Sequence, residues 1–170
     1  MRVCITGGIA CGKSLLSSYL RELGIELIDA DDIAHELIPD GAERRRIAQE
    51  VFADPEKRRA LEAKMHPIIR KRLDAFRGVH VIPLLFELHW EGKYDIICSI
   101  ISEKSVQIDR MTRLRGYTRE EAEARLAAQL PVEYKAEHSH YVIRNDGDEE
   151  SLKAEAVKLA GYLKEQMQHG

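Results

Sequence analysis

The sequence predicts an α/β fold in which helices cover both faces of a five-stranded parallel sheet. Strand-like and helix-like segments alternate along most of the chain, which is typical of parallel strands joined by helical crossovers. Residues 95–101 form an almost unbroken apolar run, as expected of a strand buried on both faces. Residues 7–14 read G-G-I-A-C-G-K-S and match the phosphate-binding pattern G-x-x-x-x-G-K-[ST]. Together these observations predict the three-layer P-loop NTPase fold.

The segments around the loop are the ones that this pattern requires. Residues 2–6 favour a β-strand, and Gly24 is suited to end the helix that follows the loop. Between them, apolar side chains recur with helical spacing at Leu16, Tyr19, Leu20 and Leu23. The order strand, glycine-rich loop, helix therefore favours a genuine nucleotide site.

Such a loop binds phosphates because its backbone N–H groups and the positive end of the next helix attract anions. Lys13 adds a mobile cation, and the hydroxyl of Ser14 can bind Mg²⁺. The alternative, a glycine-rich turn with a surface lysine, does not explain why all four fixed positions are filled. We expect the nucleotide to contact Gly8, Ile9, Ala10, Cys11, Gly12, Lys13, Ser14 and Leu15.

A helical insert is expected after the second strand. Residues 25–29 predict that strand, and helical patterns then continue to residue 76. Two prolines divide the stretch, at Asp54-Pro55 and at His66-Pro67, and each is predicted to begin a new helix. We expect residues 32–78 to form this insert within a single domain of residues 1–170.

Residues 79–82, 95–101 and 141–143 complete the predicted sheet. A pair of helices is expected before the last strand, over residues 106–114 and after the capping box that begins at Thr118. This lid region spans residues 105–131. The second lid helix is expected to carry Ala122, Leu126 and Leu130. The C-terminal helix is expected to bury Leu152, Ala156, Leu159, Leu163 and Met167.

Composition narrows the class of partner. The 170 residues contain 26 Lys and Arg and 29 Asp and Glu, which gives a net charge of −3. This balance, without a basic face, favours small-molecule partners over nucleic acid or a membrane surface. No apolar stretch approaches the ~20 residues of a membrane span, so a cytoplasmic protein is expected, either monomeric or a weak homo-oligomer.

The three cysteines predict neither a disulfide framework nor a zinc site, because their number is odd and their spacing is irregular. Cys4 and Cys98 are expected to be buried in strands. Cys11 lies in the phosphate loop near a helix N-terminus, where a lowered thiol pKa is one interpretation. The alternative, which we favour, is that Cys11 fills a position that accepts small residues.

Two acids follow the second strand, at the sheet edge where open α/β proteins bind ligands. Asp29 or Asp31 can orient the hydroxyl that accepts a phosphoryl group, because a loose transition state does not need a strong base. Capping of the next helix is an equally good interpretation of these two acids.

Cationic side chains gather in the lid, and we expect one or two of them to contact phosphate. These are Arg110, Arg113, Arg115, Arg119 and Arg125. His66 can contact substrate or cap a helix, and Glu87 can contact substrate or form a salt bridge. His138 and His140 lack an evident third ligand, so a metal site there is not expected.

Several ordered segments give the chain a resemblance to the dephospho-CoA kinase family along nearly its whole length. The segments are residues 6–14, 28–31, 33–34, 51–55, 61–62, 66–70, 83–87, 128–129 and 142–147. The resemblance implies transfer of the γ-phosphoryl group of ATP to the ribose 3′-hydroxyl of dephospho-CoA, the last step of coenzyme A synthesis. It also implies that the lid closes over the reactants and excludes water.

The resemblance also assigns roles to residues. Asp31 would be the catalytic base, assisted by Lys13 and by Arg115 or, less well matched, Arg113. Ser14 would bind Mg²⁺, while Arg110, Asn145 and Gly147 would contact the nucleotide. The acceptor would contact Asp31, His35, His66, Arg70, Leu85 and Glu87.

The chain departs from the family pattern after Ile38-Pro39-Asp40, where it is shorter, and at Ala10, Cys11 and Leu15 in the loop. Because the backbone forms the cradle, the loop changes leave phosphate binding plausible. The shorter insert keeps open a related kinase of another small acceptor. A nucleotide-binding module without transfer activity is the third possibility.

Overall fold

A computed structural model describes residues 1–38 and 41–169 of the chain. These residues form two compact units, one of residues 1–27 and 78–169 and one of the described residues between 28 and 77. Among the helices of the described residues, none is both long and apolar enough to cross a membrane.

The sheet has the five predicted strands in the order β2-β3-β1-β4-β5. Their bounds are β1 Val3–Gly7, β2 Leu27–Asp29, β3 Val79–Val81, β4 Ile96–Ile101 and β5 Tyr141–Arg144. β1 pairs in parallel with both β3 and β4, with Val3 opposite Val79 and Ile96, and β4 pairs in parallel with β5. The central position of β1 explains why every one of its residues is buried.

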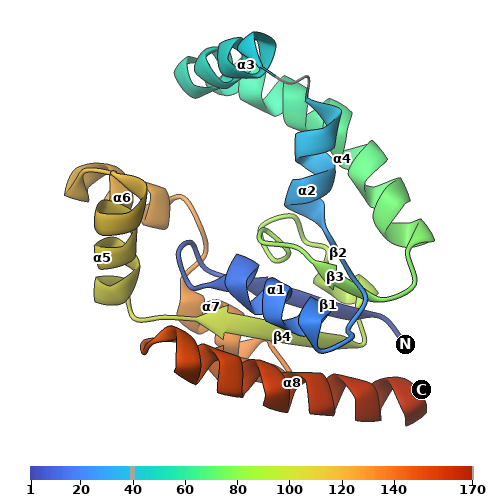
Figure 1. Cartoon of the computed structure of the whole chain (residues 1–170). Helices are drawn as coiled ribbons and strands as arrows, with labels where there is room; N and C mark the ends of the chain where they lie inside the picture. Colours follow the sequence, from blue (N-terminus) through green and yellow to red (C-terminus); the bar gives the residue numbers. More distant parts are fainter. Residues whose placement is uncertain (39–40, 170) are drawn as a thin grey trace. The chain divides into compact units, whose positions relative to one another are not determined.

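Helices cover the two faces of the sheet through alternating side chains. Val3 and Ile5 of β1 join a core with the apolar stripes of α1 (Lys13–Glu22) and α8 (Glu149–His169). Thr6 and Ser99 lie opposite each other on β1 and β4, and Ser99 bonds to the backbone of α7 (Val132–Glu137). Because successive strand residues point to opposite faces, α7 covers the face opposite to α1 and α8 (Figure 1).

The two helices that are expected to form a lid are α5 (Lys104–Arg115) and α6 (Arg119–Ala127). A short 3₁₀ helix at Glu91–Lys93 precedes β4. Both bonds of the predicted capping box at Thr118 are present, so this helix start is confirmed. Leu130 was expected on the same helix, but α6 ends at Ala127 and Leu130 instead bonds to Glu87 through its backbone.

Two further expectations in this unit need correction. The sequence pattern did not reveal α7, which is only six residues long and too short to show helical periodicity. On α8 the predicted stripe is buried at four positions, but Met167 is 49% exposed. Met167 lies in the last turn of the helix, beyond the end of the stripe that meets the core.

The unit of residues 28–77 is helical after β2, with α2 (Ala30–Leu37), α3 (Ala42–Ala53) and α4 (Pro55–Ala75). Asp54 caps α4 by accepting from the amides of Glu56 and Lys57, and Pro55 occupies the first turn as predicted. The predicted break at His66-Pro67 is wrong, because Pro67 lies inside α4. A proline removes one helical hydrogen bond, and the buried Ile69 and Leu73 anchor the helix beyond it.

Candidate nucleotide-binding site

The phosphate loop joins β1 to α1, as the sequence predicts. Gly12 is the N-cap of α1 and has a φ of 91°, in the left-handed region that favours glycine. Glycine offers no capping side chain, and the N-terminus of a helix is a favourable place for an anion. Ala10 also has a positive φ, of 56°.

The carbonyl groups of the loop are bound from outside. Four side chains donate to them: Lys135 to Gly7 (3.3 Å), Gln107 to Ile9 (2.8 Å), Arg110 to Ala10 (3.1 Å) and Asn145 to Cys11 (2.9 Å). Backbone amides bind the carbonyls of Gly8 and Gly12: the amide of Cys11 donates to Gly8 and the amide of Leu16 donates to Gly12. Because these carbonyls are bound within the protein, the loop can present amides other than those of Gly8 and Cys11 to phosphate oxygens.

Gly8 allows neighbouring side chains to pack closely around the loop. A Cβ atom at this position would lie 2.5 Å from Val132 Cγ1, 2.8 Å from Gln107 Nε2 and 2.9 Å from Cys11 Sγ. These distances are shorter than any ordinary contact, so a larger residue would displace the side chains that hold the loop.

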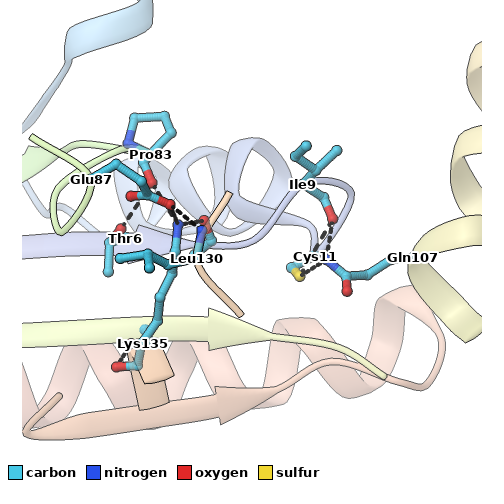
Figure 2. Close-up of polar contacts among 10 residues, drawn as sticks. Thr6, Ile9, Cys11, Pro83, Glu87, Gln107, Leu130 and Lys135 are labelled. Atoms are coloured by element: carbon cyan, nitrogen blue, oxygen red, sulfur yellow. Dashed lines mark hydrogen bonds and ion pairs between the residues drawn. The ribbon is translucent and has the colours of Figure 1, made fainter. Parts of the chain in front are cut away.

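Cys11 is completely buried, and its thiol contacts the side chain of Gln107 (Figure 2). Burial raises the pKa of the Cys11 thiol above its usual value. The interpretation of Cys11 as a low-pKa thiol is therefore wrong, and the packing interpretation holds. Cys4 and Cys98 are buried in β1 and β4, as expected.

A pocket of about 270 Å³ adjoins the loop. It brings together several residues that the sequence analysis assigned to the nucleotide: Ala10, Gly12, Leu15, Arg110, Arg115, Asn145 and Gly147. Leu114, Asp148, Glu149 and Leu152 complete its lining. Between the two candidate arginines, Arg115 faces this pocket, whereas Arg113 forms an ion pair with Asp109 at 3.3 Å.

Arg110 joins the phosphate loop to the turn after β5. One terminal nitrogen donates to Ala10 O and to Ser102 Oγ at 3.0 Å. The other donates to the carbonyls of Asn145 and Gly147, at 2.9 and 3.4 Å. Arg110 thus shapes the pocket from within the protein.

In the unit of residues 28–77, Asp29 and Asp31 divide the two roles considered for them. The carboxylate of Asp29 caps α2 and accepts from the amide of Asp31 at 2.8 Å. Asp31 lies in the first turn of α2 with its side chain exposed. Capping therefore belongs to Asp29, and the Asp31 carboxylate faces solvent.

The expected acceptor residues of this unit lie on α2 and α4. His66 and Arg70 are one turn apart and share a face of α4, while His35 lies on α2. An ion pair between Glu36 and Arg72 joins the two helices.

Leu85 and Glu87, which were expected to contact the acceptor, both make contacts within the protein. Leu85 is 0% exposed, so its side chain belongs to the core. Glu87 forms a salt bridge with Lys135 at 2.9 Å, which confirms the alternative interpretation for this acid. Lys135 itself was missed, because the helix that directs it inward was not predicted.

The two histidines that were considered as metal ligands, His138 and His140, form hydrogen bonds with backbone groups. His138 ends α7, and its ring contacts the carbonyl of Tyr134. His140 accepts from the amide of Ile97 through Nδ1 at 3.0 Å.

Comparison with known proteins places the chain in a family. The sequence pattern of the dephospho-CoA kinase family matches residues 1–44 and 37–151. The dephospho-CoA kinase of Anaeromyxobacter dehalogenans is 36% identical over 196 aligned positions, which cover 96% of this chain and 93% of that protein. The structure of dephospho-CoA kinase from Campylobacter jejuni has a TM-score of 0.69 and 25% identity, and the match covers 97% of this chain and 98% of that one.

A shikimate kinase from Acinetobacter baumannii, 16% identical with a TM-score of 0.66, shares the fold over 97% of this chain and 93% of that one. The fold and the loop thus define a P-loop kinase. More particularly, the chain belongs to the dephospho-CoA kinase family.

The comparison also agrees with a shortened insert. The 196 aligned positions exceed the 170 residues of the chain, so the relative has residues that this chain lacks. The two family matches overlap over residues 37–44, the region that is expected to be shorter than in the family. Pro39 and Asp40 lie outside the described residues.

Proposed function

We propose that this protein transfers the γ-phosphoryl group of ATP to the ribose 3′-hydroxyl of dephospho-CoA, giving coenzyme A and ADP. The observation that carries the proposal is the phosphate loop, whose carbonyls are bound from outside in a chain of the dephospho-CoA kinase family. A role in coenzyme A synthesis supports the cytoplasm as its location.

The loop and the adjoining pocket provide the site for ATP. Lys13 would bind the β- and γ-phosphates, and Arg115 would stabilise the charge that develops during transfer. The pocket beside Arg110, Asn145 and Gly147 has room for the adenine.

Ser14 is the residue that would hold Mg²⁺. Within the described part of the chain, no group of three His, Cys, Asp or Glu side chains forms a ready metal site. A single hydroxyl ligand such as that of Ser14 suits Mg²⁺, because this ion usually keeps several waters and binds through substrate phosphates with few protein ligands. The ion would neutralise charge on the phosphates.

Asp31 is the residue that would orient the acceptor hydroxyl. Its carboxylate is exposed and is not needed to cap α2, since Asp29 does so. In a loose transition state the carboxylate needs only to hold the hydroxyl in line and accept its proton. His35, His66 and Arg70 would bind the acceptor from α2 and α4.

The test is coupled ADP release with dephospho-CoA, compared with AMP, gluconate and shikimate as acceptors. We expect turnover with dephospho-CoA that requires Mg²⁺, and coenzyme A as the product identified by mass. Equal or greater turnover with another acceptor would assign the protein to a different small-molecule kinase. ATP binding without turnover of any acceptor would show a nucleotide-binding module.

A further inference from the structure

Lys135 is completely buried, with 0% of its surface exposed. It lies on the inner face of α7 together with Val132, three residues earlier. A buried ammonium group is costly unless its charge is paired and its N–H groups are bonded. The surroundings of Lys135 therefore indicate what it does.

The ammonium group has three acceptors, one for each of its N–H bonds. They are Glu87 Oε1 at 2.9 Å, the carbonyl of Pro83 at 3.1 Å and the carbonyl of Gly7 at 3.3 Å. Figure 2 shows the side chain extending from α7 toward Glu87 and Pro83. The lysine thus joins the segment after β3 to the first residue of the phosphate loop.

Both ends of Lys135 are fixed. The hydroxyls of Ser99 and Ser139 donate to its backbone carbonyl, at 3.0 and 2.7 Å. At the other end, Thr6 donates to the same Pro83 carbonyl that Lys135 binds, at 3.2 Å (Figure 2). The ammonium group therefore cannot move without breaking bonds to several segments.

The peptide bond between Gly7 and Gly8 is held on both sides. Its carbonyl accepts from Lys135, and its N–H donates from Gly8 to the carbonyl of Ile100 at 3.4 Å. Because a peptide bond is planar, these two contacts fix the direction in which the loop leaves β1. Gln107, Arg110 and Asn145 act only on later carbonyls of the loop.

Glu87 extends the same connection to the end of the lid region. Its Oε1 atom also accepts from the amide of Leu130 at 3.1 Å, three residues after α6 ends. One carboxylate oxygen therefore receives the lysine that binds Gly7 and the amide that follows the lid.

We propose that Lys135 is a positioning residue for phosphoryl transfer, which fixes the Gly7 carbonyl and connects the base of the phosphate loop through Glu87 to the end of the lid. The inference rests on the proposed use of residues 7–14 as the phosphate cradle. Lys135 is too deeply buried to touch the nucleotide, so it acts through the loop.

The experiment compares Lys135→Met with Lys158→Met, a control on the exposed face of α8. The dissociation constants of ATP and adenosine are measured by titration, alongside turnover of dephospho-CoA and thermal stability. We expect Lys135→Met to weaken ATP binding by about tenfold or more, the loss typical of a bond to a charged group. Adenosine binding should change less than about twofold, because the adenine pocket keeps its other contacts.

A second variant separates positioning from folding. Lys135→Met alone leaves Glu87 as a partly buried, unpaired acid, whereas the Glu87→Gln/Lys135→Met double variant removes both charges and should regain thermal stability. We expect the double variant to keep the weak ATP binding and low kcat, and Glu87→Gln alone to bind ATP more tightly than the double variant.

Recovery of ATP affinity and kcat together with stability would overturn the proposal. An equal loss of ATP and adenosine binding in Lys135→Met would also overturn it. The same holds if the double variant and the unmodified protein have equal dissociation constants for ATP. ATP titration does not require the acceptor, so absent turnover of dephospho-CoA by the unmodified protein would refute the proposed function without deciding the role of Lys135.

Discussion

The side-chain amide of Asn145 donates to the carbonyl of Cys11 at 2.9 Å, which joins the turn after β5 to the phosphate loop. The same amide nitrogen lies 2.5 Å from the place that a Cβ atom on Gly12 would occupy. Asn145 is itself buried, and its backbone carbonyl accepts from Arg110 and Ser102. The pocket beside the loop and the phosphate loop itself therefore share the support of one residue.

Asn145→Ala should weaken both the fold and nucleotide binding. The substitution leaves the buried Cys11 carbonyl without its donor, which costs about 1–3 kcal/mol of stability. We expect ATP affinity to fall by about tenfold, since the centre of the loop loses its support. Chemical denaturation and calorimetric titration measure the two effects. Unchanged ATP affinity would show that the loop keeps its shape without this bond.

Asp31→Asn should separate nucleotide binding from transfer. We expect the ATP dissociation constant to stay within about twofold, while kcat falls by at least about a hundredfold because the acceptor loses its base. Asp29→Asn is the matched control, since asparagine can also cap α2. If the Asp29 variant lost as much turnover as the Asp31 variant, Asp31 would have no special role as base.

Gly8→Ala should disturb the loop by crowding. The added methyl group meets Val132, Gln107 and Cys11, so we expect a loss of about 1–3 kcal/mol in stability and weaker ATP binding. Gly161→Ala on α8 is the control, because open space surrounds that position and alanine favours a helix by about 0.5–1 kcal/mol. Thermal denaturation of both variants checks the opposite signs, and a stable Gly8→Ala protein with normal ATP affinity would contradict the packing argument.

Stability should fall in alkaline solution because of Cys98. Burial raises the pKa of this thiol from 9.0 to about 12, so the unfolded chain loses the proton first as pH rises. The protonated Cys98 thiol leaves the free energy of unfolding at its full value below pH 9.0, and the free energy of unfolding falls as the pH rises toward 12. Linkage predicts that this one group lowers the free energy of unfolding by about 1.4 kcal/mol between pH 8 and pH 10.

Cys98→Val removes the ionisable group and keeps an apolar side chain in β4. Urea denaturation of both proteins at pH 8 and pH 10 measures the difference between their alkaline losses. Equal losses would show that Cys98 makes no contribution to the pH dependence.

Local signals in the sequence were sufficient for the sheet, the phosphate loop and the helix starts at Pro55 and Thr118. Buried strands are apolar along their length, and a helix cap is formed by residues that are neighbours in the sequence. Both can therefore be recognised without knowledge of distant contacts. Pro67 shows the limit of local signals, because the packing of Ile69 and Leu73 keeps α4 continuous through a residue that usually ends a helix.

The supports of the phosphate loop lie beyond what local patterns reveal. Gln107, Asn145 and Lys135 bind loop carbonyls from positions 98 to 134 residues away in the sequence. A lysine in a charged stretch such as V-E-Y-K-A-E looks like a surface residue until its helix is known. The phosphate loop was visible in the sequence because its own residues form the motif. The side chains that support it could not be recognised, because they reach the loop only through tertiary contacts.

The contacts of Arg110 matter for compounds designed against this pocket. Its guanidinium donates hydrogen bonds to four oxygen atoms of the protein, so this part of the pocket wall is formed without a nucleotide. An inhibitor that offers a carboxylate to these two terminal nitrogens competes with the bonds that they already make, so it gains less net affinity than it would from an unbonded guanidinium. Flat aromatic groups that stack against the guanidinium face avoid that cost and should make better leads.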